Sequence, residues 1–498
     1  MAHHHANGIP PRLLMWQRVR EYAVPPSMIE KATARRAAGD WAGACAAARI
    51  DVDFDLRAVR GRHGPDVANH LRTDLRRLAP DLLRWHMPRI APDGRLRPAL
   101  TVSLSHYQSS GGVPLQLVVR TPPARADAGQ RMSLALWEGP GDGSAGRHHP
   151  HPHPDRRFRL DLHRHLWDGE RSGELARRCG GGPAPAVAPF GRTRASGRAA
   201  PPGLPDAATA DDASWAVQNW AAEAELLLGS EGRPRGAFTV RLGARSRAVL
   251  ELVAPDDSHA PTFRPLREAL PRQEAAALPV LPEAAARTLP DLELLQAGLV
   301  PAERLHPLVA AALAGFATAP AAALAPEPRD PHRVECRGEV HRIALRNGVL
   351  TAIDHDPVEL RREDLLVALG GPALPCLRAI DLVHRSPEAL PAVRERLCHG
   401  DTAGALAVVE GLLGPAAVLR AGPLREALES AAARRVDHGL FRAGLVAVHP
   451  AADAGEDRKG SGVGHAEVDH RPRLDRRVPA AMHRKKSSRA RPRTGLHR

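Results

Sequence analysis

A short sequence that occurs twice places the strongest constraint on what this chain can fold into. Residues 39–46 read GDWAGACA and residues 400–407 read GDTAGALA, so six of the eight positions are identical. Each copy follows an arginine- and alanine-rich stretch with helical spacing. A glycine ends a helix by entering the left-handed region, and the aspartate after it caps the next helix. The repeated sequence therefore predicts a helix-turn-helix corner at both places, the unit from which helical interaction repeats are built.

The positive charge of the chain is concentrated at its C-terminal end. The 498 residues carry a formal net charge of +14. Residues 468–498 contain nine Arg, two Lys and two Asp, so this tail contributes +9 and the rest of the chain only +5. A run of this kind can neutralise phosphates and give non-specific nucleic-acid binding. It contains no aromatic residue that could stack on bases, so an unselected disordered end is the alternative.

The cysteines and the hydropathy pattern indicate the compartment. The five cysteines are scattered and form no CxxC pair, which argues against a disulfide scaffold and against a zinc finger. The first 20 residues lack the apolar segment of a signal peptide, and the most apolar run, 308–325, is alanine-rich and interrupted by proline. We expect a soluble cytoplasmic protein that does not interact with membranes.

The N-terminal part predicts helices followed by an antiparallel sheet. Helices are expected from Pro26 to Gly39, from Asp40 to Arg49 and over Asp66–Trp85, where apolar residues recur at three- and four-residue steps. The period then changes to two. Strands are expected over four stretches: 101–105, 115–120, 131–137 and 158–162. This order of elements is typical of an α+β domain.

The remaining segments alternate between strands and helices. A helix over 213–228 capped by Gly229 precedes strands 237–242 and 248–253, and a proline-punctuated helical stretch covers 266–316. Asn347-Gly348 predicts a tight hairpin between strands 333–345 and 349–353. A helix from Pro357 to Gly370-Gly371 and helices over 391–447 follow. The predicted divisions are 1–24 (disordered N-terminus), 25–180 (α+β domain), 181–212 (linker), 213–316 (helix, hairpin and helical segment), 317–331 (linker), 332–390 (β-hairpin plus helix), 391–447 (helical hairpins) and 448–498 (basic disordered tail).

Residues 396–415 (RLCHGDTAGALAVVEGLLGP) resemble the start of an ankyrin repeat. Gly400 and Asp401 match the turn of that pattern, and Val408-Val409 match its paired apolar positions. The sequence departs afterwards, because the terminal glycine is displaced and no Thr-Pro-Leu-His turn follows. The arrangement is similar to actinobacterial proteins that place ankyrin-type repeats after a mixed N-terminal region. The resemblance implies recognition of other proteins through stacked helical hairpins, with no catalytic residues to carry over.

Histidines provide the candidate metal ligands. Residues 148–153 (HHPHPH) are the densest cluster, and imidazoles bind zinc, nickel or copper. His163 and His165 would lie on the same face of a strand, which makes them the better local pair. The alternative is a Pro/His-rich loop followed by two polar positions that face outward.

Other polar clusters have a structural alternative as well. Asp51, Asp53 and Asp55 could hold a hard cation or form a solvated loop. The sequence 354–356 (DHD) could act in acid–base chemistry or only link a turn. Cys398-His399 are adjacent on a helix and so point in different directions, which favours Cys398 as a small core residue. The chain has no phosphate loop and no GxGxxG sequence, which disfavours the common ATP- and NAD-dependent enzymes. We predict no catalytic residue and no cofactor.

The sequence therefore favours a protein–protein interaction or scaffold protein with degenerate ankyrin-like repeats. Two alternatives stay open. One is an enzyme of unrecognised type in the N-terminal α+β domain, with polar groups such as His106, Asp161, His163 or His165 gathered at one pocket. The other is nucleic-acid binding through the basic tail.

Overall fold

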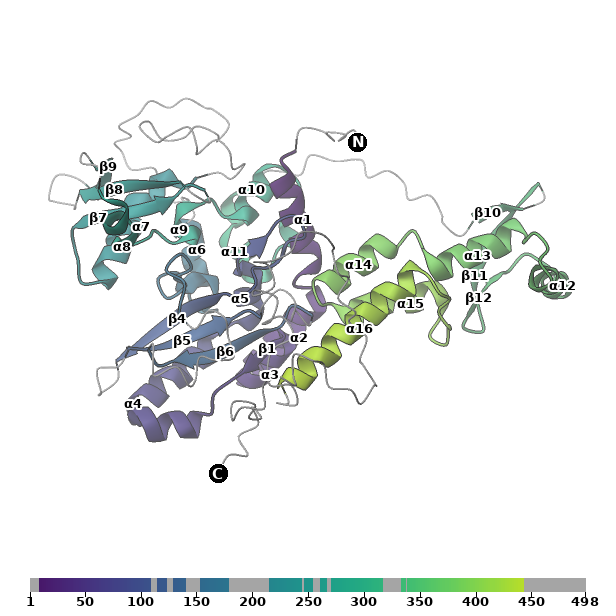
Figure 1. The fold of residues 1–498 in the computed structure, drawn as a ribbon, viewed down its shortest axis with the longest axis horizontal. Coiled ribbons are helices and arrows are strands. Elements are labelled where there is room, and N and C mark those ends of the chain that lie inside the picture. Colours follow the sequence, from purple (N-terminus) through teal and green to yellow (C-terminus); the bar gives the residue numbers. More distant parts are fainter. Residues whose placement is uncertain are drawn as a thin grey trace, which may run out of the picture. The chain divides into compact units, whose positions relative to one another are not determined.

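The chain folds into two compact units of the α+β class. The computed structural model describes residues 9–108, 114–122, 129–139, 153–178, 215–243, 246–253, 260–266, 270–316, 333–336 and 338–442. Unit 1 comprises Met1–Pro122 and Arg131–Ala321, and unit 2 comprises Pro123–Gln130 and Ala322–Arg498. Each unit combines helices with antiparallel strand pairs (Figure 1), so the fold class that the sequence predicted is confirmed.

Unit 1 begins with a helix where the sequence predicted disorder. Pro11 stands in the first turn of α1 (Pro11–Tyr22), where a missing N–H does no harm. Val19 is buried in the same core cluster as Leu294 and Leu295 of a later helix, α10 (Pro290–Gln296). The prediction was wrong because the apolar side of α1 is covered by a segment far along the chain.

The first Gly-Asp corner is formed as predicted. Gly39 has a φ of 74°, and the Asp40 carboxylate accepts a hydrogen bond of 2.8 Å from the Gly43 N–H. It joins α2 (Pro26–Ala37) to α3 (Trp41–Ala47).

The helix predicted over 66–85 is two helices. The first, α4 (Leu56–Arg77), is capped by Asp55 and is kinked at Gly64, whose φ of 89° and ψ of 170° are not helical, so the part that begins at Pro65 agrees with the predicted start. The second is α5 (Pro80–His86). Leu78 between them has an extended backbone, and Pro80 has no N–H to continue the first helix. The apolar spacing was correct, but the proline divides it.

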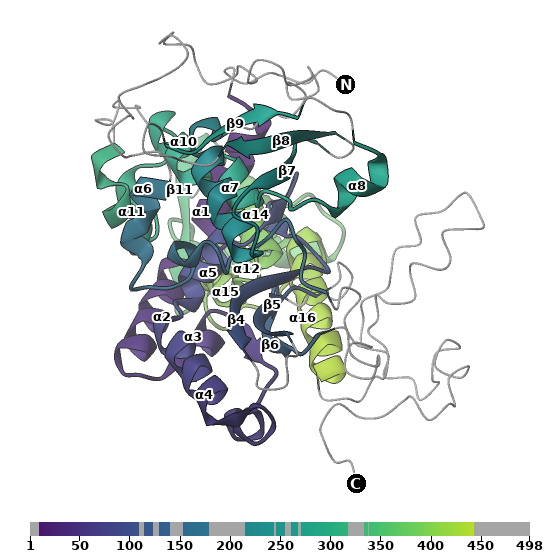
Figure 2. The same cartoon turned by 90° about the vertical axis from the view of Figure 1, so that its left-hand side faces the viewer.

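A four-stranded sheet with the order β1-β6-β5-β4 lies beside these helices, as Figures 1 and 2 show. The strands are β1 (Ile50–Val52), β6 (Met132–Trp137), β5 (Pro114–Arg120) and β4 (Thr101–Gln108). β1 runs parallel to β6 and the other pairs are antiparallel. Val102, Val119, Leu134 and Val52 follow one another across the sheet and join the core. Three of the four predicted strands are confirmed.

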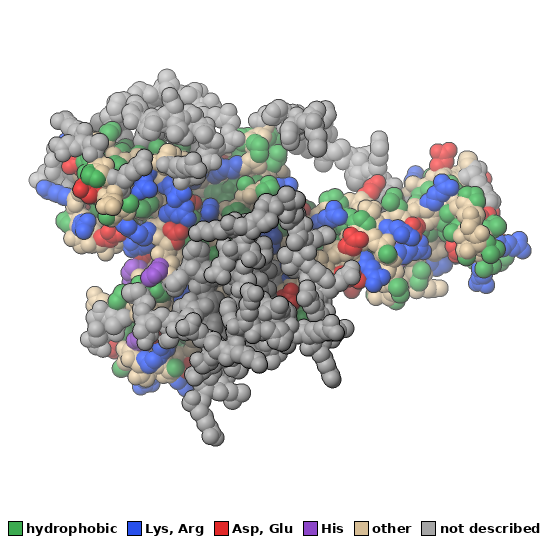
Figure 3. Space-filling view, in the orientation of Figure 1, with side chains coloured by type: hydrophobic (Ala, Val, Ile, Leu, Met, Phe, Trp, Pro, Cys, Tyr) green, Lys and Arg blue, Asp and Glu red, His purple; other side chains and the backbone are tan. Residues whose placement is uncertain are grey.

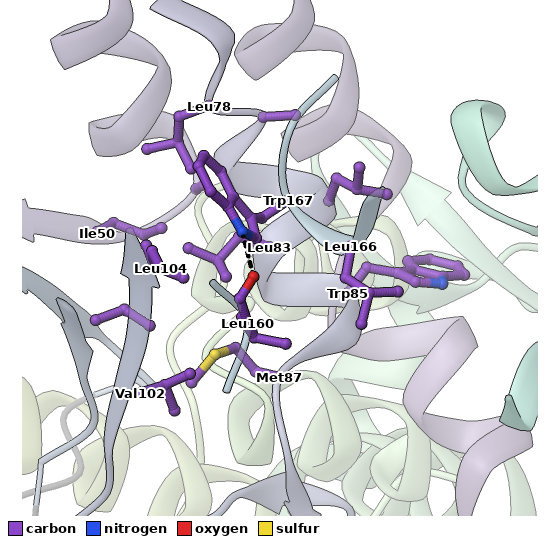
Figure 4. Close-up of a cluster of buried hydrophobic side chains, with 14 of the residues drawn as sticks. Ile50, Leu78, Leu83, Trp85, Met87, Val102, Leu104, Leu160, Leu166 and Trp167 are labelled. Atoms are coloured by element: carbon purple, nitrogen blue, oxygen red, sulfur yellow. Dashed lines mark hydrogen bonds between the residues drawn. The ribbon is translucent and has the colours of Figure 1, made fainter. Parts of the chain in front are cut away.

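The fourth predicted strand, 158–162, is not formed. Only Arg159 makes a single bridge to Ser103, and the chain then turns into a 3₁₀ helix at Arg164–Leu166. The Trp167 indole N–H donates a hydrogen bond of 2.9 Å to the Leu160 carbonyl (Figure 4). This bond holds the turn against the core. The alternation of apolar residues over 158–162 therefore reflects a turn that buries Phe158 and Leu160, and not a strand.

The rest of unit 1 adds a second, smaller core. Trp220 and Phe238 are fully buried within it, between α7 (Trp220–Ser230) and the sheet β7-β8-β9. The predicted strand pair is confirmed, while β9 was not predicted. The predicted helix starts later than expected, because a 3₁₀ turn at Val217–Asn219 precedes α7, and α7 runs one residue past the predicted cap. The elements are β7 (Gly236–Arg241), β8 (Arg247–Val253), β9 (Thr262–Pro265), β2 (Arg89–Ile90), β3 (Arg95–Leu96), α6 (Leu175–Arg178), α8 (Arg272–Ala277), α9 (Glu283–Ala286) and α11 (Pro307–Ala312).

Unit 2 contains the predicted hairpin and the second Gly-Asp corner. Asn347 and Gly348 have φ values of 52° and 77°, as a tight hairpin turn requires. Asp401 accepts from the Gly404 N–H at 3.1 Å and so caps α15. The strand predicted over 333–345 is divided in two near Gly338. The elements are β10 (Arg333–Cys336), β11 (Glu339–Arg346), β12 (Val349–Ala352), α12 (Pro357–Ala368), α13 (Pro375–Arg385), α14 (Leu390–Cys398), α15 (Thr402–Leu413) and α16 (Pro423–Arg442).

Within the described part of the chain, no helix combines the length and the apolar character needed to cross a membrane. The basic tail and the histidine-rich stretch 148–152 lie outside the described residues, so the predictions made for them stay predictions.

Candidate functional site

Unit 1 contains a cavity of about 520 Å³ whose lining is dominated by arginine. Its walls come from α1, from the segment that follows α5, from the turn region 157–166, from α7 and from residues 283–290. The charged or titratable lining residues are Arg12, Arg20, Arg89, Arg97, Arg157, Arg159, Arg178, Arg241, Arg287, Glu223, Glu283, His86, His163 and His165. Lys and Arg side chains are frequent on the face of unit 1 that Figure 3 shows.

Glu223 organises one wall of the cavity. This buried carboxylate forms an ion pair with the Arg178 guanidinium and lies 3.1 Å from the His163 Nε2. Burial raises the pKa of Glu223, but the contacts with His163 and Arg178 outweigh it and lower the pKa below its usual value. The negative charge is therefore kept in place and orients both basic side chains.

Two further arginines are held by aspartates that precede or follow them by two residues. Arg159 contacts Asp161 through Nε and Nη2, at 2.9 and 2.7 Å. Arg157 makes the same kind of contact with Asp155, at 3.2 and 3.0 Å, and its guanidinium lies 5.0 Å from the Phe158 ring. Two-point contacts fix the plane of a guanidinium. These side chains are therefore oriented before any ligand arrives.

Arg20 connects α1 to α10, which comes near the end of the unit 1 sequence. Its Nη2 donates to the Asp291 carboxylate at 2.6 Å, and its Nη1 donates to the Trp85 carbonyl at 2.8 Å. The guanidinium also lies 4.8 Å from the Trp16 ring and 4.5 Å from the Trp85 ring. Trp16 itself lines the cavity.

Two histidines of the lining are neutral. Burial lowers the pKa of His86 to about 4, and burial followed by the nearby His163 lowers the pKa of His165 well below its usual value. The His86 Nδ1 lies 3.0 Å from the Leu166 carbonyl, which can only accept, so Nδ1 carries the proton. The His86 Nε2 is then an acceptor, and it is buried without a hydrogen-bond partner among the described residues.

The structure brings His163 and His165 to the cavity but not onto a strand. Their rings lie edge to face with centroids 5.8 Å apart, on a turn and a 3₁₀ helix. His163 uses Nδ1 toward the Arg159 carbonyl and Nε2 toward Glu223. The predicted strand geometry is wrong because the chain turns at Leu160. Metal binding by this pair stays a prediction.

His106 and Asp161 lie close together without forming a catalytic triad. The His106 Nε2 lies 3.0 Å from the Ser103 hydroxyl and 3.4 Å from the Asp161 carboxylate. In a triad, the serine and the acid contact different nitrogens of the ring. Here both contact the same nitrogen, so His106 cannot take a proton from Ser103 while Asp161 supports its other side.

The remaining polar clusters have structural partners. Asp51 binds Arg131, and Asp55 accepts from the backbone N–H groups of Arg57 and Ala58, so these carboxylates hold the fold together. Asp354 accepts from the Arg342 N–H and Asp356 caps α12. These contacts favour structural roles over cation binding at residues 51–55 and over acid–base chemistry at residues 354–356.

Sequence reasoning missed the arginine-lined cavity. Arginine is common along the whole chain, and the nine that line the cavity come from segments with no shared motif. The Arg-x-Asp spacing at 159–161 and its reverse at 155–157 are the local signals that could have marked two of them.

Comparisons with protein-family models, with curated proteins and with solved structures found no match to this chain.

Proposed function

We propose that unit 1 binds a small molecule with a phosphomonoester or another dianionic group in the arginine-lined cavity. The observation that supports this most directly is the presence of nine arginines around one cavity of about 520 Å³. Small-molecule sites commonly measure roughly 300–1,000 Å³. Arginine is the residue best suited to phosphate, because its planar donors match the oxygen atoms in pairs.

The charge balance of the site favours a dianion. Seven carboxylates among the described residues lie in the lining or pair with a lining arginine: Glu223, Glu283, Asp155, Asp161, Asp291, Glu293 and Glu231. Arg97 forms no ion pair among the described residues, so its charge is available to an anionic ligand. A phosphomonoester carries about −1.5 to −2 at neutral pH and would supply that counter-charge.

Unsatisfied buried nitrogens support a polar ligand with an apolar body. The Arg97 Nε and the His86 Nε2 are both buried without a hydrogen-bond partner among the described residues. A buried unpaired polar atom costs about 1–3 kcal/mol, which a bound oxygen or hydroxyl would recover. Trp16 and Phe158 line the same cavity, and the Arg97 guanidinium lies 5.7 Å from the Phe158 ring.

Binding is better supported than covalent catalysis. The described residues that line the cavity include no serine, cysteine or lysine that a neighbouring histidine could activate. An enzyme in this part of the chain would therefore rely on Thr288, on a glutamate or histidine of the lining, or on water as the attacking group.

We expect p-nitrophenyl phosphate to bind the full chain more tightly than p-nitrophenyl sulfate or p-nitrophenol, because only the phosphate carries two charges. Arg97→Gln should weaken phosphate binding at least about 10-fold, since a hydrogen bond to a charged group contributes about 1.5–3 kcal/mol. Isothermal titration calorimetry measures both effects. Release of p-nitrophenol, followed by absorbance, reports the enzyme alternative in the same samples.

Arg264→Gln is the matched control, because Arg264 lies on β9, is half exposed and pairs with Glu251 outside the cavity. Equal affinities for the phosphate and the sulfate would contradict the proposal, and so would equal affinities of the Arg97 and Arg264 variants.

As a second candidate, we propose that unit 2 contacts another protein, as its ankyrin-like sequence implies. Helix α12 supports this, because it has no buried residue although it carries Val358, Leu365 and Leu366. Leu369 just after it is 86% exposed, and Figure 3 shows hydrophobic side chains at the surface of this part of the chain. Contiguous exposed apolar surface is typical of contact sites between proteins.

The double variant Leu365→Lys/Leu369→Lys should abolish capture of a protein that binds the wild-type chain, because buried charge would oppose the contact. Quantitative affinity capture with full-length protein, followed by reconstitution from purified components, measures the loss. Arg361→Lys/Arg362→Lys on the same helix is the control. A partner that binds both double variants equally would place the contact elsewhere.

A further inference from the structure

Two cysteines and a histidine that are far apart in the sequence meet inside unit 2. Cys336 is the last residue of β10, His355 follows β12, and Cys376 stands in the first turn of α13. Their ligand atoms, the two Sγ atoms and one ring nitrogen, all lie within 4.8 Å of one another. All three side chains are buried, and both thiols are fully inaccessible.

From this cluster we propose that Cys336, His355 and Cys376 bind a zinc ion that joins three elements of unit 2. Two thiolates and an imidazole form a donor set that suits zinc, whereas calcium and magnesium require oxygen ligands. In a tetrahedral site with Zn–S bonds of about 2.3 Å, the ligand atoms lie about 3.5–3.8 Å apart. Side-chain rotations that move each ligand atom by about 1 Å would bring the observed cluster to that geometry.

The surroundings of His355 provide an independent reason to expect an ion. The Nε2 of His355 is buried and has no hydrogen-bond partner among the described residues. Buried imidazole nitrogens normally bind a donor, an acceptor or a metal. A core of small apolar residues would explain two buried cysteines, but it would not explain this nitrogen.

The thiols of Cys336 and Cys376 contact each other. Burial, followed by the hydrogen bond with the Cys336 thiol, raises the pKa of Cys376 to about 12. The position of Cys376 in the first turn of α13 favours a thiolate once a cation is present.

His341 is a further imidazole beside His355, and it does not act as a ligand in the observed arrangement. Its ring stacks on the His355 ring with centroids 4.0 Å apart and planes 18° apart. A zinc ion lies in the plane of each ring that binds it, at about 2.0–2.1 Å from the nitrogen. Two nearly parallel planes separated by this distance cannot both contain the ion. His341 therefore covers the site from one side, and the fourth position is left to another ligand.

The site would compensate for a small core. Among the described residues, the cluster around the cysteines contains four buried apolar residues, Cys336, Ala352, Leu374 and Cys376, apart from the larger cluster of unit 2 around Ile380 and Val393. A core of this size gives little hydrophobic stabilisation, and small domains commonly add a structural metal. Zinc binding would tie the end of β10, the segment after β12 and the start of α13 together, so the binding energy would stabilise the fold.

Cobalt(II) tests the proposal, because thiolate–cobalt bonds give a charge-transfer absorption in the near ultraviolet that histidines alone cannot produce. This matters because the chain has other histidine clusters, at 3–5 and 148–153. We expect the reduced, chelator-treated full-length chain to bind one cobalt with this absorption, and zinc to abolish it by displacement. Cys336→Ser and Cys376→Ser should each remove half or more of the absorption.

Three further variants keep the test independent of folding. Cys398→Ser changes a cysteine of unit 2 outside the cluster and should leave the absorption unchanged. His355→Ala should weaken cobalt binding at least about 100-fold, more than the loss of a group that only orients a ligand. His355→Cys should increase the absorption by about half, because three thiolates would then bind the ion. Absence of the thiolate band in the reduced wild-type chain, or its full retention in both cysteine variants, would overturn the proposal.

Discussion

Replacing Asp291 with alanine should destabilise unit 1 by about 3–5 kcal/mol, because the change leaves a buried arginine without its counter-ion. Asp291 and Arg20 have side-chain exposures of 0% and 3% and lie 2.6 Å apart. Asp291 also accepts a hydrogen bond of 2.9 Å from the Trp85 indole N–H. Chemical unfolding followed by tryptophan fluorescence measures the loss.

Glu138→Ala is the control for this prediction. Glu138 pairs with Arg62 at the surface, with exposures of 37% and 54%, and such pairs contribute about 0–1 kcal/mol. The double variant Arg20→Met/Asp291→Leu should recover much of the lost stability, since it removes both buried charges. A loss with Asp291→Ala no larger than with Glu138→Ala would show that the pair is exposed to water in solution.

The Arg20–Asp291 ion pair explains why unit 1 includes segments that the predicted domain divisions separated. Asp291 belongs to α10, and Arg20 and Trp85 belong to α1 and α5. Leu294 and Leu295 of α10 share a core cluster with Val19 and Leu82. The linker composition before residue 213 suggested a boundary, yet packing across a long sequence separation is not visible in local composition.

Features that depend on neighbouring residues could be predicted well. The Gly-Asp corners, the Asn-Gly hairpin and the glycine-closed end of α12 all follow from backbone preferences within a few residues. Gly370 has a φ of 90°, and the Gly371 N–H donates to the Leu366 carbonyl at 2.8 Å, as such a helix end requires. Whether α14 and α15 belong to an ankyrin array stays a prediction.

Features that depend on distant residues could not be predicted. The cysteine spacing gave no zinc motif, although the hairpin and α13 bring Cys336 and Cys376 together around His355. The acid–base interpretation of residues 354–356 treated the three side chains as one group, whereas the structure sends each to a different neighbour. In each case the tertiary fold, not the local pattern, decides which groups meet.

Acidification from pH 6.5 to pH 4 should cost unit 1 about 3 kcal/mol through His86 alone. Burial, opposed by Asp291 and reinforced by Arg20, lowers the pKa of His86 from 6.5 to about 4. Between these values the unfolded histidine binds a proton and the folded one does not, so falling pH favours unfolding. Each unit of pKa difference contributes about 1.4 kcal/mol. His165 shifts in the same direction and adds to the effect.

Urea unfolding at a series of pH values measures this dependence, and the window above about pH 5 separates it from carboxylates. The pKa values of Glu223 and Asp155 are lowered, so their stabilisation is present above their usual range and is lost only at lower pH. His86→Asn keeps a donor for the Leu166 carbonyl but cannot titrate, so its stability should change less between pH 6.5 and 4. His70→Asn, at an exposed position of α4, is the control. An equally steep dependence in the two variants would mean that His86 is protonated in the folded chain, and the neutral acceptor assigned to the cavity would then be wrong.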